Sequence, residues 1–479
     1  MQENLKQKAI SGAIWSSVQK FGLSGISFLS NIVLARILSP SDYGCIGMLS
    51  IFIVVSTALV YGGFVSALIQ KKDTSAEDYS TVFIWNLVVA CILYCILFIC
   101  APGISDFYGI EKLSSILRVQ GIILIINGFC AIQTTLLRKQ LEFGKLAKVN
   151  ITSALISVIV AIVLAYNGLG VWSLVFQQIT VSALNCLILW SISVWKPSLK
   201  FSIKSFYALF SYGSFLLLND LFNSLCDNMQ GLLIGKKFSA STLGLYTQAR
   251  RLEEVPTQSI SQMVAQVTFP IYSKIQDDDE RLKRAVKSSL SLMNFINFPL
   301  MILLIIVAKP LIVLLFTEKW VDSVPLFQIL CLAGVVNCLQ SVNYQVVSAC
   351  GRSKELFYWN FIKRGVGIAL MLLGLNFGVQ GVMWGMAISF YFVYIVNAKL
   401  AYKSTRYSIY AQIKDSIPLL LISIFAGLFT HLLTYMDLCS ISLLIFQIAV
   451  YLLSYYFLAI LFKRTELDDI QNIILRRSL

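Results

Sequence analysis

The chain has 479 residues, of which 57% are apolar and only 13% are charged. A set of soluble domains of this length would carry roughly 25% charged residues and is therefore excluded. The net charge of +14 would suit a nucleic-acid-binding protein only if it lay on a soluble surface. Apolar runs of about 20 residues instead predict an all-α polytopic membrane protein with about 14 transmembrane helices.

The predicted spans follow one another with short connections. In chain order they cover residues 12–35, 44–68, 80–101, 116–137, 149–166, 170–194, 207–234, 243–270, 289–316, 324–349, 360–376, 380–401, 417–434 and 441–462. Stretches such as 301–308 are continuously apolar, whereas a barrel strand in lipid alternates apolar and polar residues, so helices are favoured. Most of the eleven cysteines fall in apolar runs and are interpreted as small buried hydrophobes.

Basic residues are concentrated in alternate connections. If the N-terminus is cytoplasmic, the inner connections hold most of the 38 Lys and Arg residues. The positive-inside rule therefore predicts that both termini are cytoplasmic. The charge is interpreted as a topology signal and an attraction to anionic membrane lipids, and no nucleic-acid partner is expected. The tail 464–479 is predicted to form a short amphipathic helix on the inner surface.

The chain contains a weak internal repeat at an offset of 200 residues. Residues 35–44 align with residues 235–244, so that Ser39 and Gly44 match Ser239 and Gly244. A second match joins residues 170–172 to 381–384. These matches predict two parallel six-helix lobes, 1–200 and 201–405, followed by two extra spans and the tail in 406–479. Transporters with such repeats commonly place the substrate between the halves.

Two motifs resemble the polysaccharide flippases of the multidrug/oligosaccharidyl-lipid/polysaccharide exporter superfamily. They are Leu-Ala-Arg-Ile-Leu-Ser-Pro-Ser-Asp-Tyr-Gly at 34–44 and Leu-Gly-Leu-Tyr-Thr-Gln-Ala-Arg-Arg-Leu at 243–252, the latter followed by Pro256. The similarity covers essentially the whole chain and is closest to the branch that handles O-antigen, capsule or colanic-acid-like units. It implies a MATE-like, V-shaped pair of six-helix lobes.

The same resemblance implies a function in the synthesis of surface polysaccharide, either lipopolysaccharide or capsule. Such a flippase moves an undecaprenyl-diphosphate-linked oligosaccharide from the inner to the outer leaflet of the bacterial cytoplasmic (inner) membrane by alternating access. It implies a lipid-linked oligosaccharide as substrate, and the polysaccharide polymerase and chain-length machinery as partners. No cofactor is expected.

Polar side chains recur at helical spacing inside several spans. In span 1, Ser16, Lys20, Ser24, Ser27 and Asn31 are predicted to share one helix face, and span 7 repeats the pattern with Asp220, Asn223, Asp227 and Gln230. The offset of 200 aligns Lys20 with Asp220, so the two spans carry opposite charges at equivalent positions of the repeat. Span 8 carries glutamines four residues apart after two arginines. We predict a hydrated cavity between the lobes, lined by Lys20, Ser24, Ser27, Asn31, Arg36, Asp220, Asn223, Asp227, Arg250, Arg251, Gln258, Gln262, Gln266, Lys363 and Arg364.

The predicted lining suits a sugar phosphate. Amide side chains can donate hydrogen bonds to sugar hydroxyls and accept them, and cations can compensate the negative charge of a diphosphate.

Other interpretations stay open. Serines and asparagines also cement helix packing, and Lys20 could snorkel to the interface. The basic residues also have interpretations other than substrate binding. Arg36 could anchor a helix end, and Arg250 and Arg251 could pair with Glu253 and Glu254. Lys363 and Arg364 are most simply explained as cytoplasmic anchors. Asp220 and Asp227 are either buried partners of basic residues or protonatable switches.

Enzyme signatures are lacking in the sequence. It has one histidine, His431, no cysteine pattern for zinc, no phosphate-binding loop and no nucleophile motif, so no catalytic or metal site and no enzyme activity is expected. Two alternatives to the flippase remain. One is a cation-coupled multidrug exporter of the same superfamily, which would be expected to carry carboxylates in the first lobe. The other is a non-transporting membrane enzyme of glycan assembly.

Overall fold

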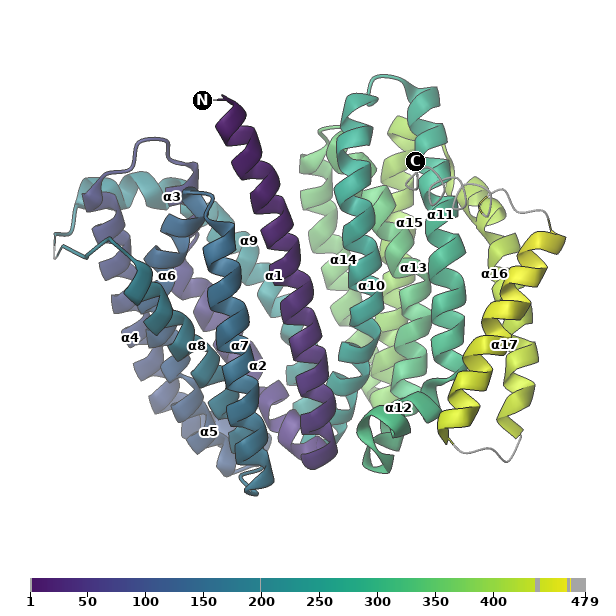
Figure 1. Ribbon diagram of the computed structural model, residues 1–479, viewed down its shortest axis with the longest axis horizontal. Coiled ribbons are helices and arrows are strands. Elements are labelled where there is room, and N and C mark those ends of the chain that lie inside the picture. Colours follow the sequence, from purple (N-terminus) through teal and green to yellow (C-terminus); the bar gives the residue numbers. More distant parts are fainter. Residues whose placement is uncertain (1, 199, 436–439, 463–465, 467–479) are drawn as a thin grey trace. The chain divides into compact units, whose positions relative to one another are not determined.

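A computed structural model describes residues 2–198, 200–435, 440–462 and 466, and Figure 1 shows their arrangement. Every regular element among these residues is a helix, which confirms the predicted all-α class. The chain divides into two compact units, residues 1–244 and 245–479. The predicted amphipathic tail lies outside the described residues, apart from Glu466.

The described part of the first unit consists of nine helices and the start of a tenth. They are α1 (Gln2–Ile37), α2 (Pro40–Tyr61), α3 (Phe64–Gln70), α4 (Ala76–Tyr108), α5 (Lys112–Gln120), α6 (Ile122–Lys139), α7 (Phe143–Tyr166), α8 (Val171–Ile192), α9 (Ile203–Lys237) and the beginning of α10 (Ala240–Lys274). Helix α10 therefore starts in the first unit and continues into the second.

The second unit contains the rest of α10 and the helices that follow it. They are α11 (Asp279–Ile306), α12 (Ala308–Phe316), α13 (Val324–Ala349), α14 (Ser353–Gly374), α15 (Gly378–Thr405), α16 (Ile409–Leu432) and α17 (Ser440–Leu461), with short 3-10 turns at Glu318–Ser323, Leu375–Phe377 and Leu433–Tyr435.

The predicted number of membrane spans is confirmed. Within the described residues, eleven stretches are long and apolar enough to cross a membrane, and one of them, Ser353–Thr405, contains both α14 and α15. Helices α9 and α10 have 35 residues each but fall below this measure of apolarity because polar side chains interrupt them. Each is long enough to cross a hydrocarbon layer of about 30 Å. Counting these helices gives fourteen spans.

Three predicted spans are broken into two helices. Span 44–68 is divided between α2 and α3 by Gly62 and Gly63, which have φ of 54° and 72°. This left-handed backbone suits residues without a side chain. Span 116–137 is divided at Gly121, and span 289–316 is divided at Val307. A count of membrane spans from hydropathy does not resolve these breaks, because each lies within a single predicted span.

Helix α9 is packed along the first unit. It lies against α2, α3 and α4. A Cβ added at Gly63 would overlap the carbonyl oxygen of Gly213, and one added at Gly231 would lie 3.0 Å from the carbonyl oxygen of Gly47. Such glycine contacts let two helix backbones approach closely. By its packing α9 belongs with the helices that precede it, whereas the sequence repeat assigns it to the second lobe.

The connection between α8 and α9 is held on α4. The hydroxyls of Ser80 and Ser198 lie 2.9 Å apart, and the backbone N–H of Ser202 donates to Thr81 Oγ1 at 3.0 Å. The ring of Trp195 packs edge-on against Tyr79 and Phe83. These contacts join the connection to a hydrophobic cluster that also includes Phe64 and Leu209, so the first unit has a continuous core from α3 to α9.

Helices α16 and α17 are integral parts of the second unit, and Figure 1 shows them side by side. Tyr451 and Tyr455 of α17 pack in one cluster with Ile422 of α16 and Phe295 of α11. The hydroxyl of Tyr455 donates to the carbonyl oxygen of Phe295 at 2.9 Å. On α16, Ser416 accepts a hydrogen bond from Asn294 at 2.7 Å. The two extra spans therefore share a core with α11.

The repeat motif forms the same local structure twice. The backbone N–H of Asp42 donates to Ser39 Oγ at 3.3 Å, and that of Thr242 donates to Ser239 Oγ at 3.1 Å. A serine hydroxyl thus caps both α2 and α10, because the first N–H groups of a helix lack partners within it. The lobes 1–200, 201–405 and 406–479 stay a prediction from this repeat.

Candidate substrate-binding faces

Helix α1 has one packed face and one exposed polar face. The packed face lies on α7, where a Cβ added at Gly22 would lie 3.3 Å from Ile151. Ser30 accepts a hydrogen bond from Gln177 of α8 at 3.1 Å. On the other face Lys20, Ser24 and Ser27 are exposed within the unit. An ammonium group is costly in hydrocarbon, so this face is suited to water or a polar substrate.

The predicted α1 stripe is not uniform. Asn31 is buried, with 8% of its surface exposed, whereas Arg36 in the last helical turn is exposed. Asn31 therefore differs in exposure from Lys20, Ser24 and Ser27, with which it was predicted to share a helix face. The reason is that α1 approaches the helices around it more closely near its C-terminal end, where Leu34 and Ala35 are also buried.

Helix α9 exposes its two carboxylates. Asp220 and Asp227 are exposed and Asn223 is half-buried, while Gln230 is buried. The predicted stripe therefore divides at its C-terminal end, where α9 packs on α2. The first unit thus presents a lysine on α1 and two aspartates on α9, in helices long enough to cross a membrane.

Helix α10 carries an internal ion pair. Arg250 Nε lies 2.6 Å from Glu254 Oε1, and an Arg250 NH group donates to the hydroxyl of Tyr246 at 3.3 Å. This is the intrahelical pairing that the sequence left open as an alternative to substrate contact. Because both charged groups are about one-third exposed, the pair can still meet a ligand. Pro256 lies inside α10, and the helix continues past it.

The remaining predicted residues of α10 differ in exposure. Arg251, Gln258 and Gln266 are exposed, and Gln262 is half-buried. The four-residue spacing therefore does place a row of amides along one side of α10, next to Arg251.

Lys363, which the sequence explains most simply as a cytoplasmic anchor, is buried within the second unit. Only 7% of its surface is exposed. Its Nζ donates to Asn397 Oδ1 on α15 at 3.0 Å. Asn397 in turn donates to the side chain of Gln340, which donates to Asn337 Oδ1 at 2.6 Å. The sequence could not reveal this because Lys363 and Asn397 come together only when α14 packs on α15. Arg364, the next residue, is half-buried.

Sequence reasoning did not identify Glu253 as a buried acid. Only 7% of its surface is exposed, and Thr257 Oγ1 donates to Glu253 Oε1 at 2.6 Å. The carboxylate packs against Gly334 of α13, where an added Cβ would lie 2.7 Å from Oε1. Nearby, Asn297 Nδ2 donates to the Gly334 and Val335 carbonyl oxygens at 3.1 and 3.0 Å. The spacing of Glu253 and Thr257, one helical turn apart, was the sequence feature from which their hydrogen bond could have been predicted.

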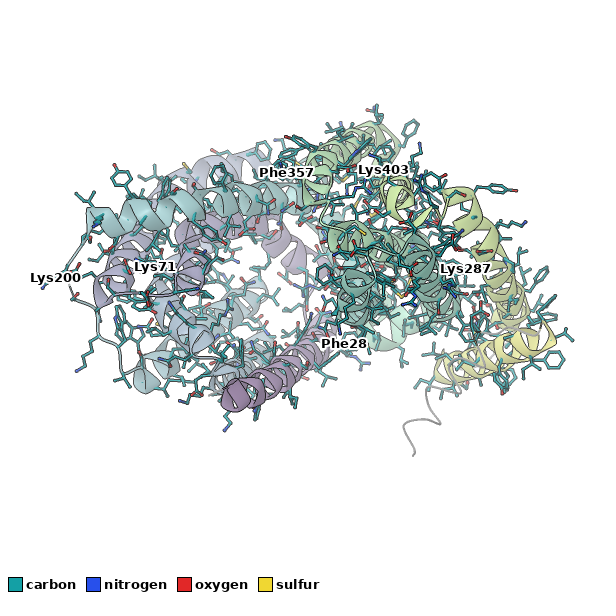
Figure 2. The ribbon with its side chains drawn as sticks, turned by 90° about the horizontal axis from the view of Figure 1, so that it is seen from above. Phe28, Lys71, Lys200, Lys287, Phe357 and Lys403 are labelled. Carbon is teal, nitrogen blue, oxygen red and sulfur yellow. The ribbon has the colours of Figure 1, made fainter. Side chains whose placement is uncertain are left out.

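Several basic residues in the predicted cytoplasmic connections are structural. Figure 2, a view from above, labels Lys71 and Lys200 in the first unit and Lys287 and Lys403 in the second. Lys71 pairs with buried Asp78 at 2.7 Å, and Lys403 pairs with Glu355 at 2.9 Å.

Lys287 takes part in a further contact in the second unit. It lies 2.9 Å from Asp415 Oδ2, which also accepts a hydrogen bond from the hydroxyl of Tyr407 at 2.7 Å. Burial, aided by Asp415, raises the pKa of Tyr407 above its usual range, so this hydroxyl remains a donor at neutral pH. The contact joins α11 to the start of α16.

Within the described residues, no group of three His, Cys, Asp or Glu side chains is placed to hold a metal ion. The polar faces carry cations and amides, which can bind a sugar phosphate by charge and hydrogen bonds, and carboxylates, which can accept hydrogen bonds from sugar hydroxyls. Long apolar helices with ionisable side chains along their length define a multi-pass membrane protein.

Comparison with known families then gives a particular assignment. Residues 33–325 match the family described as "Polysaccharide biosynthesis protein", and the chain belongs to this family. The chain is 27% identical over 375 residues to the teichuronic acid biosynthesis protein TuaB of Bacillus subtilis (strain 168), covering 78% of this chain and 76% of that protein. It is 25% identical over 373 residues to the succinoglycan biosynthesis transport protein ExoT of Rhizobium meliloti (strain 1021), covering 77% and 75%.

Two solved structures show a similar fold. The lipid II flippase MurJ in an inward closed conformation matches with a TM-score of 0.77 at 17% identity, over 95% of this chain and 99% of that chain. An inward-facing multidrug resistance transporter of the MATE family matches with a TM-score of 0.61 at 14% identity, over 85% and 98%. The expected MATE-like fold is confirmed.

Proposed function

We propose that the protein is a flippase for a lipid-linked oligosaccharide in the synthesis of a surface polysaccharide. It moves an undecaprenyl-diphosphate-linked repeat unit from the inner to the outer leaflet of the bacterial cytoplasmic membrane. Membership in the polysaccharide biosynthesis family and the name of the ExoT relative, a transport protein, support this assignment. They favour a transporter over a catalytic enzyme.

The observation that carries the proposal is the exposed ionisable side chains on membrane-length helices. Lys20 on α1 and Arg251 on α10 are exposed within their units, together with the serines and glutamines one or two turns away. Exposure to lipid would cost several kcal/mol for each charge, by the order of magnitude known for bilayers. A wet substrate path removes that cost. Cations there can hold a diphosphate, and amides can exchange hydrogen bonds among sugar hydroxyls.

The proposed mechanism is alternating access. The polyprenyl chain stays in lipid while the headgroup passes along the polar faces of α1, α9 and α10. The protein makes and breaks no bond in the cargo, so the cargo leaves in the form in which it was bound. The affinity for the headgroup must therefore be weak enough to allow release. Amide rows such as Gln258 to Gln266 suit this requirement, since neutral hydrogen bonds are individually weak and easily exchanged with water.

The proposed orientation places both termini in the cytoplasm. The connections that carry Lys71, Lys200, Lys287 and Lys403 are then the cytoplasmic ones. Anionic lipid headgroups there attract these side chains.

The test is a depletion experiment in the native host with a labelled lipid-linked repeat unit. Depletion is expected to leave synthesis of the lipid-linked unit intact and to reduce its appearance at the periplasmic face, and wild-type protein restores it. A normal rate of appearance after depletion would falsify the proposal. Purified protein in liposomes, assayed for changed covalent products, separates the flippase from a glycan-modifying enzyme, and a drug-resistance assay separates it from a multidrug exporter.

A further inference from the structure

A chain of hydrogen-bonded side chains runs from α14 through α15 to α13. Helix α15 packs on both α13 and α14 in the second unit (Figure 1). The ammonium group of Lys363 on α14 donates to Asn397 Oδ1 at 3.0 Å. Asn397 Nδ2 approaches the backbone oxygen and the Oε1 atom of Gln340 on α13, each at 3.4 Å, and Gln340 Nε2 donates to Asn337 Oδ1 at 2.6 Å. We call Lys363, Asn397, Gln340 and Asn337 the amide chain.

The lysine sets the direction of the amide chain. An ammonium group has three donors and no acceptor, so Asn397 must turn its oxygen toward Lys363 and its NH2 group toward Gln340. Each following amide likewise accepts on its oxygen and donates from its nitrogen. The NH2 group of Asn337 is therefore left as the last donor, and within the part of the chain that the structure describes no group accepts a hydrogen bond from it.

The amide chain contains a buried positive charge that no carboxylate compensates. Among the described residues, no Asp or Glu side chain forms an ion pair with Lys363, whereas Lys287 and Lys403 of the same unit each pair with one. A charge in the middle of a membrane-length helix is costly unless it is balanced. Hydrogen bonds in a medium of low dielectric constant polarise one another, so the charge strengthens the donor at the far end of the amide chain.

The far end of the amide chain lies on a polar face of α13. Asn337 is half-buried near the middle of this helix, and half-buried Ser341 and exposed Tyr344 follow one and two turns later. Residues at this spacing share one side of a helix. Helix α13 belongs to a stretch that is long and apolar enough to cross a membrane. This face is therefore suited to water or a polar ligand rather than to lipid.

We propose that the end of the amide chain is a binding site for an anionic oxygen of the cargo, either on the diphosphate or on the carboxylate of an acidic sugar. The NH2 group of Asn337 donates to the anion. Lys363 acts through the amides, by fixing their direction and by supplying the charge that the anion balances, so it is a positioning residue. The proposal rests on the proposed function, since the anion belongs to the cargo, and every residue of the site lies in the second unit.

The first test measures binding of defined probes to the full chain in lipid nanodiscs. The anionic probes are undecaprenyl diphosphate and decyl glucuronide, and decyl glucoside is the neutral probe. Asn337→Ala is expected to weaken binding of an anionic probe by about tenfold, as for loss of one charge-assisted hydrogen bond, and to leave binding of the neutral probe unchanged. The anionic probe that responds identifies the source of the anion.

Two further variants sharpen the first test. Asn337→Asp has nearly the same size but replaces the donor by a charged acceptor, and it should weaken anion binding more than Asn337→Ala does. Asn167→Ala is the control, because it removes an exposed asparagine that bonds only to Val163 near a helix end, and it should bind every probe like the wild type.

The second test asks whether Lys363 acts through Asn337. Lys363→Gln is expected to weaken binding of the same anionic probe by about tenfold, and Lys363→Arg, which keeps a cation without an acceptor, should retain more of the affinity. Lys354→Gln removes an exposed lysine near the start of the same helix and should have no effect. The double variant of Lys363→Gln and Asn337→Ala should bind no more weakly than Asn337→Ala alone. Additive losses would contradict the role of the amide chain.

Wild-type affinity of Asn337→Ala and Asn337→Asp for both anionic probes would refute the site. No binding of either anionic probe to the wild-type protein, or an equal loss for the neutral probe, would refute it as well. The Asn337 variants decide the matter even if Lys363→Gln does not fold. The assay also does not depend on transport. Weakened anion binding by these variants of a protein that exports no glycan would refute the proposed function and keep the site, whereas normal glycan export with unchanged anion binding would do the reverse.

Discussion

The ammonium group of Lys363 donates to Asn397 Oδ1 at 3.0 Å, which joins α14 to α15 through a cation that is 93% buried. A buried cation in a membrane-length helix is either a costly packing element or a functional charge. The two roles predict different results when the charge is removed, because loss of a packing element lowers stability, whereas loss of a functional charge lowers export.

Lys363→Met removes the buried charge but leaves Asn397 Oδ1 without its donor, so the stability of the folded protein is expected to change by no more than about 1–3 kcal/mol, and export is expected to fall. Asn397→Leu leaves the ammonium without its acceptor and is expected to destabilise the protein by about 1–3 kcal/mol. Thermal unfolding of both variants in the same detergent provides the measurement. A large loss of stability with normal export in Lys363→Met would show that the charge is structural.

Lys20→Ala is expected to reduce export at least tenfold without changing membrane insertion, if the ammonium contributes about 1.5–3 kcal/mol to holding a phosphate. Lys20→Arg should retain much of the activity because it keeps the charge. Lys72→Ala, which removes an exposed lysine from a connection, is the matched control. Surface glycan per cell, normalised to membrane-inserted protein, provides the measurement, and equal output from Lys20→Ala and Lys72→Ala would remove Lys20 from the site.

Arg250→Gln is expected to affect export more than stability. Its pair with Glu254 is about one-third exposed, so the pair itself contributes only about 0.5 kcal/mol. Glu254→Gln removes the same pair but leaves the cation and serves as the control. If both variants lower export equally, the ion pair matters rather than the arginine, and the proposed contact of Arg250 with substrate is wrong.

Asn297→Ala is expected to destabilise the second unit by about 2–4 kcal/mol, because the Gly334 and Val335 carbonyl oxygens lose their donor and a cavity forms. Asn167→Ala removes an exposed asparagine that bonds only to Val163 near a helix end, and its effect should stay within about 0.5 kcal/mol. Denaturant unfolding in detergent compares them. Similar values for the two variants would show that the buried bonds around Asn297 add little stability.

The helices and their number could be predicted from the sequence because hydrocarbon demands long apolar segments with internally satisfied backbones. The breaks at Gly62, Gly121 and Val307 were not predicted, since each lies within a single predicted span. The packing partners of α9 could not be predicted either. The repeat groups α9 with the following helices, but the packing of Gly213 and Gly231 groups it with the preceding ones.

The polar faces were predictable in part. Helical spacing correctly placed Lys20, Ser24 and Ser27 on an exposed face, since spacing fixes which residues share a side. It could not tell that Asn31 is buried or that Lys363 meets Asn397, because both depend on neighbouring helices that are distant in sequence. Spacing within one helix did suggest a pairing of Arg250 with Glu254, and this proved correct.

The seating of α9 on α2 also bears on the order in which the chain assembles. Until residue 237 has left the ribosome, the backbone beside Gly47 and Gly63 has no helix to cover it and faces lipid or the insertion machinery. The first unit is therefore a product of the first 244 residues rather than of the first six spans. A nascent chain arrested after α8 should be less protected from proteases than one arrested after α9.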